Sequence, residues 1–353
     1  MKEKIKTLCI VAGSSGGHIL PGLAYAAKMK QYQKDVRVIC ITTKKDLDRK
    51  IVAQYEWVIH CPLAIKNYPG ISFKLIPWMF SFKWAAFKSC YYLMRYRADF
   101  VMSMGGYISL PVWLAAKILR KPFEAYELNV VPGKAIKALA RLRVVIRGCF
   151  DQTKQYLPAR AKFILSTYPI RFNLSHRKSI EQAREFFNIP RESFVIFVVG
   201  GSQGSDFLNT LMKQIFERIS AEGNISKKDL FIIHQTGVDA VARVKALYDQ
   251  VGITAHVVSY LEHIENAFQA ADCVVSRAGA GVLAELDYFK CKAALLPLHS
   301  LDTMHQYDNA LQYVMRKPEQ YALFDQKIIE REPLALCAWF EKLYIGKNSS
   351  IKG

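Results

Sequence analysis

The chain has 353 residues, of which 51% are hydrophobic, so it holds enough apolar material for the cores of two ordinary domains. Mean hydropathy is +0.05, and every stretch of transmembrane length carries charge, so we expect no membrane-spanning helix. Of the net charge of +19, most lies in residues 1–150, which hold 25 Lys and Arg against 8 Asp and Glu. This basic half predicts an anionic partner: a phospholipid surface, nucleic acid or a phosphorylated substrate.

The eight cysteines show no C-x-x-C spacing, and several lie in apolar runs. We expect buried thiols in a reducing compartment, neither disulfide-bonded nor zinc-bound, which favours the cytoplasm. The basic and then apolar N-terminus superficially resembles a signal peptide. Its apolar part is short and leads into a glycine loop, so we interpret it as the first strand.

Strands, glycine loops and helices alternate in the first half of the chain, which predicts a parallel sheet with helices on both faces. Each predicted strand is followed by a loop rich in small residues, and such loops gather at the carboxyl edge of a parallel sheet and line one cleft. The predicted strands are 6–12, 36–42, 99–104 and 123–127, the helices are 19–30 and 111–119, and the loops are 13–18, 105–109 and 128–133.

The same unit recurs after a polar linker at 167–171. We therefore expect two doubly wound, Rossmann-like α/β domains, 1–165 and 166–353, facing each other across a cleft. The predicted strands are 194–199, 230–234, 256–258, 273–276 and 293–296, the helices begin near 206, 282 and 334, and residues 347–353 are predicted to be a frayed tail.

The stretch 271–310 has the order strand, small-residue loop, helix, strand. A loop such as Arg277–Gly281 exposes backbone N–H groups at a helix N-terminus, where the helix dipole favours anions. Glu285 lies about one turn into the helix, and a carboxylate there can accept hydrogen bonds from a ribose diol. The order indicates a nucleotide site, although a tight turn followed by a dipole-complementing Glu has the same pattern.

Aromatic and basic residues alternate over 75–97, including Trp78, Phe82, Lys83, Trp84 and Lys88. An amphipathic helix with an aromatic core face accounts for some of these residues. A mixture of Trp, Phe and Lys on one side is typical of a lipid headgroup boundary. Stacking on nucleic-acid bases is the alternative, but the sequence has no nucleic-acid-binding motif, so we expect a membrane partner and no nucleic acid.

Several motifs, in order, resemble the MurG glycosyltransferase family. They span nearly the whole chain, and the combination of GGHxxPGLA, GGSQG and HQxxNA is the specific part. The matching stretches are Gly13–Leu23, Met104–Tyr107, Glu127 with Asn129, Pro169 with Arg171, Gly200–Gly204, Arg277–Glu285, and His305-Gln306 with Asn309-Ala310. The chain departs from the usual family motifs at Tyr126, Leu128, Gly281 and Val282.

The resemblance implies a GT-B fold and an inverting transfer of N-acetylglucosamine from UDP-N-acetylglucosamine to an undecaprenyl-diphosphate-linked muramyl peptide in peptidoglycan synthesis. It implies a peripheral enzyme on the cytoplasmic face of the inner membrane, with no cofactor and no metal. The alternatives are another nucleotide-sugar transferase with a lipid acceptor, or an inactive GT-B protein that binds membranes or partner proteins.

The resemblance also assigns residues by position. Asn129 matches a residue on the donor or acceptor side, Leu261 meets uracil through its backbone, and Tyr107 belongs to the acceptor side. The substrate-binding positions are Ser15, Gly16, Gly17, Asn129, Arg171, Ser202, Leu261, Ala280, Gly281, Val282, Leu283, Ala284, Glu285 and Gln306.

Inversion requires a base that takes the proton of the acceptor hydroxyl. His18 is the candidate because it adjoins a glycine loop at the cleft edge, although it could also be a helix residue that only bonds backbone. Glu127 is a second candidate catalytic residue on its motif. Asp46 and Asp48 form a D-x-D pattern in a Lys-rich segment, which we interpret as solvated charge instead of a metal site.

Overall fold

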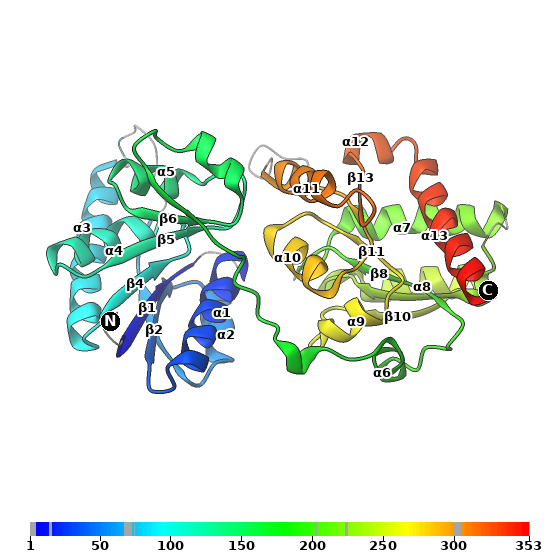
Figure 1. The fold of residues 1–353 in the computed structure, drawn as a ribbon, viewed down its shortest axis with the longest axis horizontal. Coiled ribbons are helices and arrows are strands. Elements are labelled where there is room, and N and C mark those ends of the chain that lie inside the picture. The colour runs from blue at the N-terminus through cyan, green and yellow to red at the C-terminus, as the bar shows by residue number, and fades with distance from the viewer. Residues whose placement is uncertain are drawn as a thin grey trace. The chain divides into compact units, whose positions relative to one another are not determined.

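The computed structural model describes residues 5–13, 16–66, 73, 75–201, 203–222, 225–298 and 305–352. The chain divides into two compact units, Met1–Arg171 and Phe172–Gly353. The division predicted between residues 165 and 166 lies shortly before this boundary. Each unit is a parallel sheet covered by helices (Figure 1), so the predicted α/β class with two doubly wound domains is confirmed.

The sheet of the first unit has the strand order β3-β2-β1-β4-β5-β6-β7 among the described residues, and all its neighbours pair in parallel. The order reverses direction between β1 and β4, and ligands of such sheets bind beside this point. The strands are β1 (Thr7–Val11), β2 (Arg37–Thr43), β3 (Val58–Leu63), β4 (Phe100–Ser103), β5 (Phe123–Glu127), β6 (Val145–Gly148) and β7 (Lys162–Leu165).

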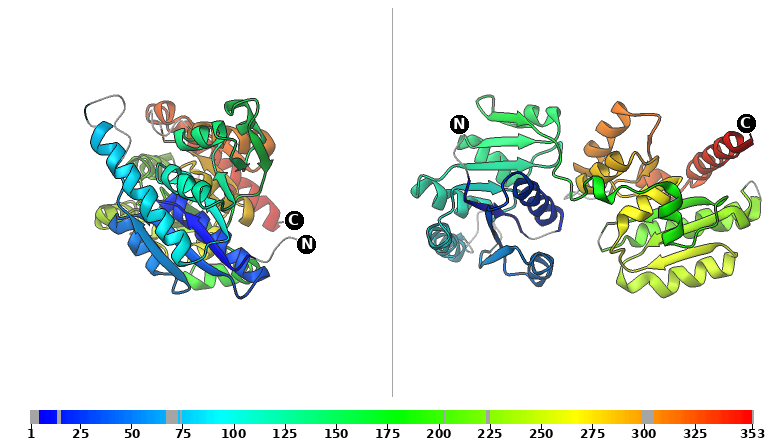
Figure 2. Two further views of the ribbon diagram at one scale, coloured as in Figure 1. Left: turned by 90° about the vertical axis from the view of Figure 1, so that its left-hand side faces the viewer. Right: turned by 60° about the horizontal axis from the view of Figure 1, so that its bottom comes forward.

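Helices α1 and α2 pack against each other, as do α3 and α4, and α4 also contacts α5. Figure 2 shows α3 along the outside of this unit. The helices are α1 (Gly16–Tyr32), α2 (Asp46–Ala53), α3 (Leu75–Arg95), α4 (Ser109–Ile118) and α5 (Lys134–Arg141), with a 3₁₀ turn at Asp151–Tyr156. None of the described helices in the chain is both long and apolar enough to cross a membrane.

The sheet of the second unit has the order β10-β9-β8-β11-β12-β13, again parallel. Its central strands are fully buried and mostly apolar, as expected for strands covered on both faces. The strands are β8 (Phe194–Val199), β9 (Leu230–Gln235), β10 (Thr254–Val258), β11 (Cys273–Ser276), β12 (Ala293–Leu295) and β13 (Tyr321–Leu323).

Helices α7, α8 and α13 contribute to one large apolar core with alternate residues of β8 and β9. Helix α9 contacts α6 and α10, and α10 contacts α11. The helices are α6 (Ile180–Phe186), α7 (Asp206–Glu222), α8 (Val241–Val251), α9 (Ile264–Ala270), α10 (Ala280–Phe289), α11 (His305–Arg316), α12 (Gln326–Ile329) and α13 (Leu334–Lys352), with 3₁₀ turns at Leu174–His176, Lys227–Asp229 and Val238–Ala240.

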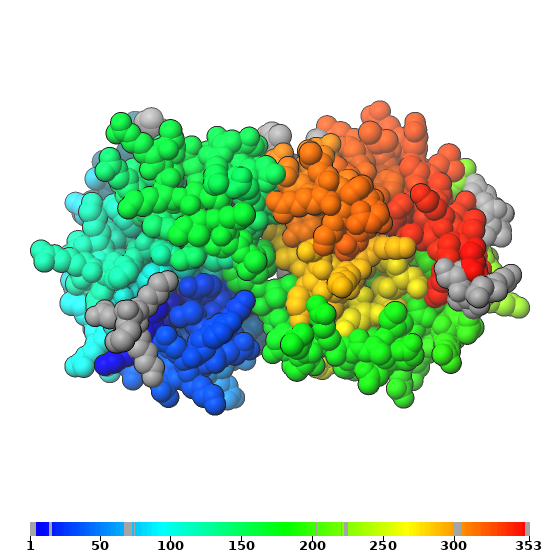
Figure 3. Space-filling model, viewed as in Figure 1, coloured from blue at the N-terminus to red at the C-terminus, as the bar shows by residue number. Residues whose placement is uncertain are grey.

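The predicted frayed tail is wrong over residues 347–352, because α13 continues to Lys352. Lys347 fixes this end: its Nζ lies 2.8 Å from Asp272 Oδ2 and donates to the Ser193 carbonyl at 2.7 Å. The helix lies on the surface of its unit (Figure 3, red). A long-range ion pair of this kind leaves no mark in the local sequence pattern.

His234 is a buried titratable group that costs stability in acid. Its Nδ1 lies 2.8 Å from the Tyr248 hydroxyl, and its Nε2 has no hydrogen-bond partner in the described part of the chain. Burial lowers the pKa of His234 to about 3, from an ordinary value of 6.5. The unfolded chain therefore takes up this proton first as the pH falls.

We predict that the free energy of unfolding, relative to that of His234→Gln, falls as the pH drops from about 6.5 towards 3, by up to about 1.4 kcal/mol per pH unit. The stability that depends on neutral His234 is fully present above pH 6.5 and is lost progressively as the pH falls from 6.5 towards 3. Urea unfolding of both proteins over this range measures the difference. Parallel stability curves would show that His234 does not titrate between the folded and unfolded states.

Candidate functional site

The carboxyl edge of the second sheet collects three loops from neighbouring strands. β9, β8 and β11 lie side by side, and each ends in a segment that leads directly to the next helix or turn. Because the strands are parallel, these segments meet at one edge. This edge contains the two glycine motifs predicted to bind a nucleotide, 200–204 and 277–281.

Arg277, in the segment after β11, bonds from inside the protein to the segment after β8, to the end of β12 and to α12. It is only 7% exposed, and its guanidinium donates to Ser205 Oγ at 3.1 Å, to the Leu296 carbonyl at 3.2 Å and to Gln326 Oε1 at 2.9 Å. It also lies 4.5 Å from the centre of the Phe207 ring. Burial lowers the pKa of Arg277 to about 10, so the group stays charged at neutral pH.

Gln235, at the end of β9, joins two further segments. Its Nε2 donates to the Gly201 carbonyl at 2.7 Å, and its Oε1 accepts from the Leu261 backbone N–H at 2.9 Å. Gly204 has a φ of 76° and lies against Thr236, the residue after β9. A Cβ atom on Gly204 would lie 2.0 Å from the Thr236 carbonyl oxygen. Only glycine fits this position, so the loop after β8 is fixed against the end of β9.

Helix α10 begins at this edge without a side-chain cap, because its N-cap residue is Gly279. Unbonded N–H groups of a first helical turn are a ready site for an anion. Within the helix Leu283 and Ala284 are buried, whereas Ala280, Gly281, Val282 and Glu285 are half-buried. Gln306, half-buried at the start of α11, accepts from the Leu298 N–H at 3.0 Å.

In the first unit, His18 lies in the first turn of α1, with Nδ1 2.6 Å from the Met104 carbonyl oxygen. A carbonyl only accepts, so Nδ1 carries the proton and the neutral ring has its lone pair on Nε2. The contact joins the loop after β1 to the loop after β4. In this tautomer Nε2 is the ring nitrogen that can accept a proton.

Glu127 is buried at the end of β5, and both of its oxygens accept hydrogen bonds. Oε1 accepts from the Asn129 backbone N–H at 2.9 Å and from its side-chain amide at 3.2 Å, and Oε2 accepts from the Gly133 N–H at 3.0 Å. Burial raises the pKa of Glu127, and the bonds from Asn129 and Gly133 oppose this shift. The carboxylate thus shapes the loop between β5 and α5.

Asp46 and Asp48 differ in a way that corrects our interpretation of the pair as solvated charge. Asp46 is exposed and pairs with Arg49 at 2.8 Å. Asp48 is 0% exposed, and its Oδ2 accepts from the Thr43 N–H at 3.0 Å and from the Thr43 hydroxyl at 2.5 Å. The described residues contain no group of three or more His, Cys, Asp or Glu arranged to hold a metal ion.

Residues 8–146 match the model of the glycosyltransferase family 28 N-terminal domain, and residues 195–331 match that of the C-terminal domain. The chain is 32% identical to the UDP-N-acetylglucosamine–N-acetylmuramyl-(pentapeptide) pyrophosphoryl-undecaprenol N-acetylglucosamine transferase of Desulfotalea psychrophila, over 89% of this chain and 83% of the relative. It is 31% identical to the enzyme of the same name from Thermotoga neapolitana, over 90% and 88%. The chain belongs to this transferase family, MurG.

The crystal structure of Acinetobacter baumannii MurG has the same fold, with a TM-score of 0.71 and 23% identity over 96% of this chain and 94% of that one. A glycosyltransferase of kitacinnamycin is also similar, with a TM-score of 0.64 and 15% identity over 97% and 91%. These likenesses extend over both units, as the GT-B prediction requires.

The MurG motifs fall at the carboxyl edges of the two sheets. Glu127 ends a strand of the first sheet, and Gly16, Gly17, His18, Tyr107 and Asn129 follow its strands. Leu261, Ala280 to Glu285 and Gln306 follow strands of the second sheet. Arg171 is the last residue of the first unit. Ser15 and Ser202 lie outside the described residues. The sequence did not predict that Arg277 and Gln235 join the loops of this edge. A single polar residue at the end of a strand gives no periodic signal.

Helix α3 presents an exposed apolar face that only partly coincides with the predicted one. Trp84 and Lys83 are exposed as expected, whereas Trp78 and Phe82 are half-buried with ring centres 5.3 Å apart. Lys88 is half-buried and lies 5.4 Å from the Tyr92 ring. The other exposed apolar residues of the helix are Ile76, Met79, Phe80, Phe87, Tyr91 and Met94.

We predict that Gln235→Leu lowers the free energy of unfolding by about 1–3 kcal/mol, because the Leu261 N–H and the Gly201 carbonyl both lose their partner. Hydrogen exchange at the Leu261 amide should become faster. Exchange at the amides in the core of β8 should change only as much as the lower free energy of global unfolding requires. Gln320→Leu, whose amide donates to the Cys291 carbonyl at the other edge of the sheet, is the control. Unchanged Leu261 exchange in Gln235→Leu would exclude the bridging role.

Proposed function

We propose that the chain transfers N-acetylglucosamine from UDP-N-acetylglucosamine to a polyprenyl-diphosphate-linked muramyl peptide. The names of its relatives describe this reaction for those enzymes. The observation that carries the proposal is α10, whose uncapped N-terminus adjoins the loop held by Arg277 and whose Glu285 lies half-buried about one turn further on. This arrangement offers an anion site and a diol acceptor on one helix.

Four parts of the donor have their own contacts under this proposal: the diphosphate, the ribose, the uracil and the sugar. The diphosphate meets the N-terminal turn of α10, and the family motifs assign Arg171 and Ser202 to the diphosphate as well. The ribose hydroxyls donate to Glu285. The Leu261 N–H is already bonded to Gln235, so its carbonyl is the backbone group that accepts from uracil, and Gln306 contacts the sugar.

The reaction breaks the bond between the anomeric carbon and the UDP oxygen and forms a bond from that carbon to the acceptor oxygen. His18 Nε2 takes the proton of the acceptor hydroxyl, while Nδ1–H stays bonded to the Met104 carbonyl. UDP leaves as an anion that the helix N-terminus and cationic side chains stabilise, so we expect no metal requirement. Glu127 positions Asn129, since both carboxylate oxygens already accept bonds.

The exposed face of α3 supports a membrane partner. A helix with a face of Ile, Phe, Trp, Tyr and Met in water leaves a large apolar surface unpaired, and such surfaces mark interaction sites. Lys83 beside it supplies attraction to anionic headgroups. The polyprenyl tail keeps the acceptor in the bilayer, so we propose a peripheral enzyme on the cytoplasmic face of the inner membrane. The sequence has no nucleic-acid-binding motif, so we propose no nucleic-acid partner.

We predict that Glu285→Ala weakens UDP binding by about 1–3 kcal/mol, because the ribose loses a charged hydrogen-bond acceptor. Isothermal titration with UDP measures this change. Glu319→Ala, an exposed carboxylate of the same unit, is the control and should bind as the unmodified protein does. Unchanged UDP affinity in Glu285→Ala would remove the ribose assignment.

We predict that His18→Ala lowers kcat about 10²- to 10⁴-fold while UDP binding is largely kept, because the acceptor proton loses its base. The assay uses labelled UDP-N-acetylglucosamine, a short-chain analogue of the lipid acceptor and no added metal. Turnover by the unmodified protein tests the proposed reaction itself. A His18→Ala rate near that of the unmodified protein would leave positioning as the only role of this loop.

We predict that Phe80→Ser with Trp84→Ser reduces binding to anionic vesicles and activity on a long-chain acceptor, yet spares activity on a soluble short-chain acceptor. Tyr32→Ser with Leu165→Ser, two exposed apolar residues elsewhere in the unit, is the matched control. Binding by the unmodified protein should fall as salt rises, since the Lys contribution is screened. Vesicle flotation that is equal for both double variants would exclude α3 as the membrane contact.

A further inference from the structure

A cavity of about 740 Å³ lies at the amino edge of the second sheet. Its lining includes Asp272, directly before β11, and Lys292, directly before β12. The end of α10, the second half of α13, the end of α9 and the segment around Arg177 also contribute to the lining. The strands run parallel, so this edge is opposite the loop of Arg277 and the N-terminus of α10. The cavity is therefore separate from the proposed donor site.

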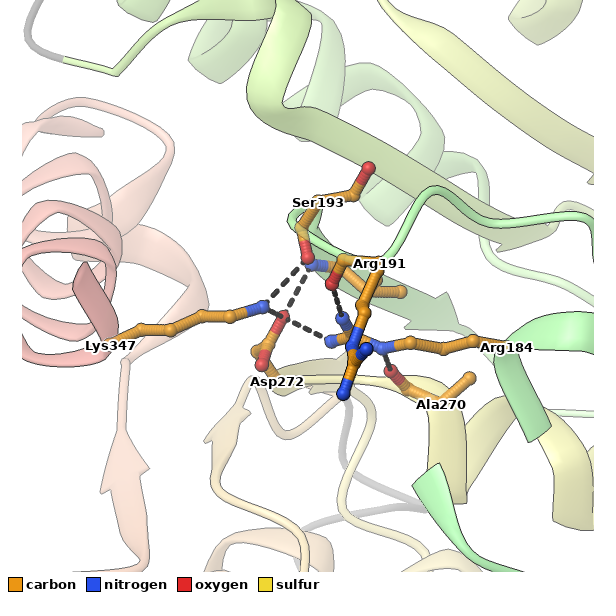
Figure 4. Close-up of polar contacts among 7 residues, drawn as sticks. Arg184, Arg191, Ser193, Ala270, Asp272 and Lys347 are labelled. Carbon is orange, nitrogen blue, oxygen red and sulfur yellow. Dashed lines mark hydrogen bonds and ion pairs between the residues drawn. The ribbon is translucent and has the colours of Figure 1, made fainter. Parts of the chain in front are cut away.

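The lining is strongly basic. Asp272 is the one carboxylate among the described lining residues, and its Oδ2 already has three partners (Figure 4): Arg184 at 2.9 Å, Lys347 at 2.8 Å and the Val195 N–H at 2.7 Å. The six cationic residues are Arg177, Lys178, Lys290, Lys292, Lys342 and Lys347. Most of this positive charge has no compensating carboxylate in the cavity.

Beside the cavity, a polar network holds the backbone segments in place. Arg184 donates to the Ala270 carbonyl at 3.2 Å and to the Arg191 carbonyl at 2.8 Å, in addition to Asp272 (Figure 4). Lys347 reaches from α13 to Asp272 and to the Ser193 carbonyl. Segments from α6, β8, β11 and α13 are thereby fixed relative to one another, so the cationic residues extend from an ordered frame.

Arg177 gives the cavity a pre-oriented guanidinium. It lies 4.8 Å from the centre of the Tyr288 ring and donates to the Tyr288 carbonyl at 3.3 Å. Stacking of this kind reduces the freedom of the side chain and leaves further N–H groups of the planar fork to bind oxygen atoms in pairs. Lys292 and Lys342 are exposed and make no ion pair with a described residue.

We propose that this cavity binds a phosphorylated ligand through its phosphoryl oxygens, at a site distinct from the donor site. Arg and Lys together are the residues that bind phosphate most strongly, and the volume is that of an ordinary small-molecule site. A soluble phosphorylated metabolite and a phospholipid headgroup present the same chemistry. The proposal does not depend on the transferase reaction.

The test uses two double variants. The cavity variant carries Lys292→Gln and Lys342→Gln, and the control variant carries Lys245→Gln and Lys327→Gln. The control removes the same charge from exposed lysines of the same unit outside the cavity. Two probes are used: inorganic diphosphate by isothermal titration with excess UDP present, and flotation with phosphatidylglycerol vesicles against phosphatidylcholine vesicles. Thermal unfolding checks that both variants stay folded.

We expect the cavity variant to bind one probe roughly tenfold more weakly than the control variant, the scale of two partly screened charge contacts. Loss with diphosphate assigns a soluble phosphorylated ligand, and loss with phosphatidylglycerol vesicles alone assigns a headgroup. Equal binding of both variants to both probes, or no binding of either probe by the unmodified protein, would overturn the proposal.

Discussion

The hydrogen bonds of one buried guanidinium hold the carboxyl edge of the second unit together. Arg277 meets neutral oxygens from the loop after β8, the end of β12 and the start of α12, and it stacks on Phe207. A buried charge is tolerated only when such partners replace water, and removing one partner is costly. The loops that surround α10 therefore keep one arrangement, and the proposed nucleotide site, built from backbone N–H groups, depends on that arrangement.

Helix α10 links the two ends of its unit. Its N-terminus belongs to the proposed donor site and its C-terminus, with Tyr288, Phe289 and Lys290, lines the basic cavity. Parallel strands force this division, because every helix that follows a strand runs from the carboxyl edge back to the amino edge. One helix is thus shared by the two proposed anion sites. The helix dipole would favour the anion at its N-terminus, whereas cationic side chains would bind the anion near its C-terminus.

The sequence predicted what depends on local pattern. Apolar runs followed by glycine loops located β1, β5, β8 and β11 within a residue or so, and the motifs placed the candidate site at the carboxyl edges. It failed to predict two side-chain partnerships: Lys347 of α13 reaches the distant Asp272, and the buried Asp48 accepts hydrogen bonds from Thr43, five residues before it. On α3, composition could not tell which aromatic residues pack inward, so Trp78 and Phe82 were placed on the membrane face with Trp84, although they are half-buried.

The thiols of this protein have a practical consequence. Every cysteine is free, six of the eight are buried, and burial raises the pKa values of Cys9 and Cys273, so these thiols are inert while the fold is closed. Cys9 and Cys40 lie in the first sheet, and Cys273 and Cys337 lie in the core of the second unit. Alkylation followed by peptide mass mapping would therefore report the opening of each unit separately, with no label added to the chain.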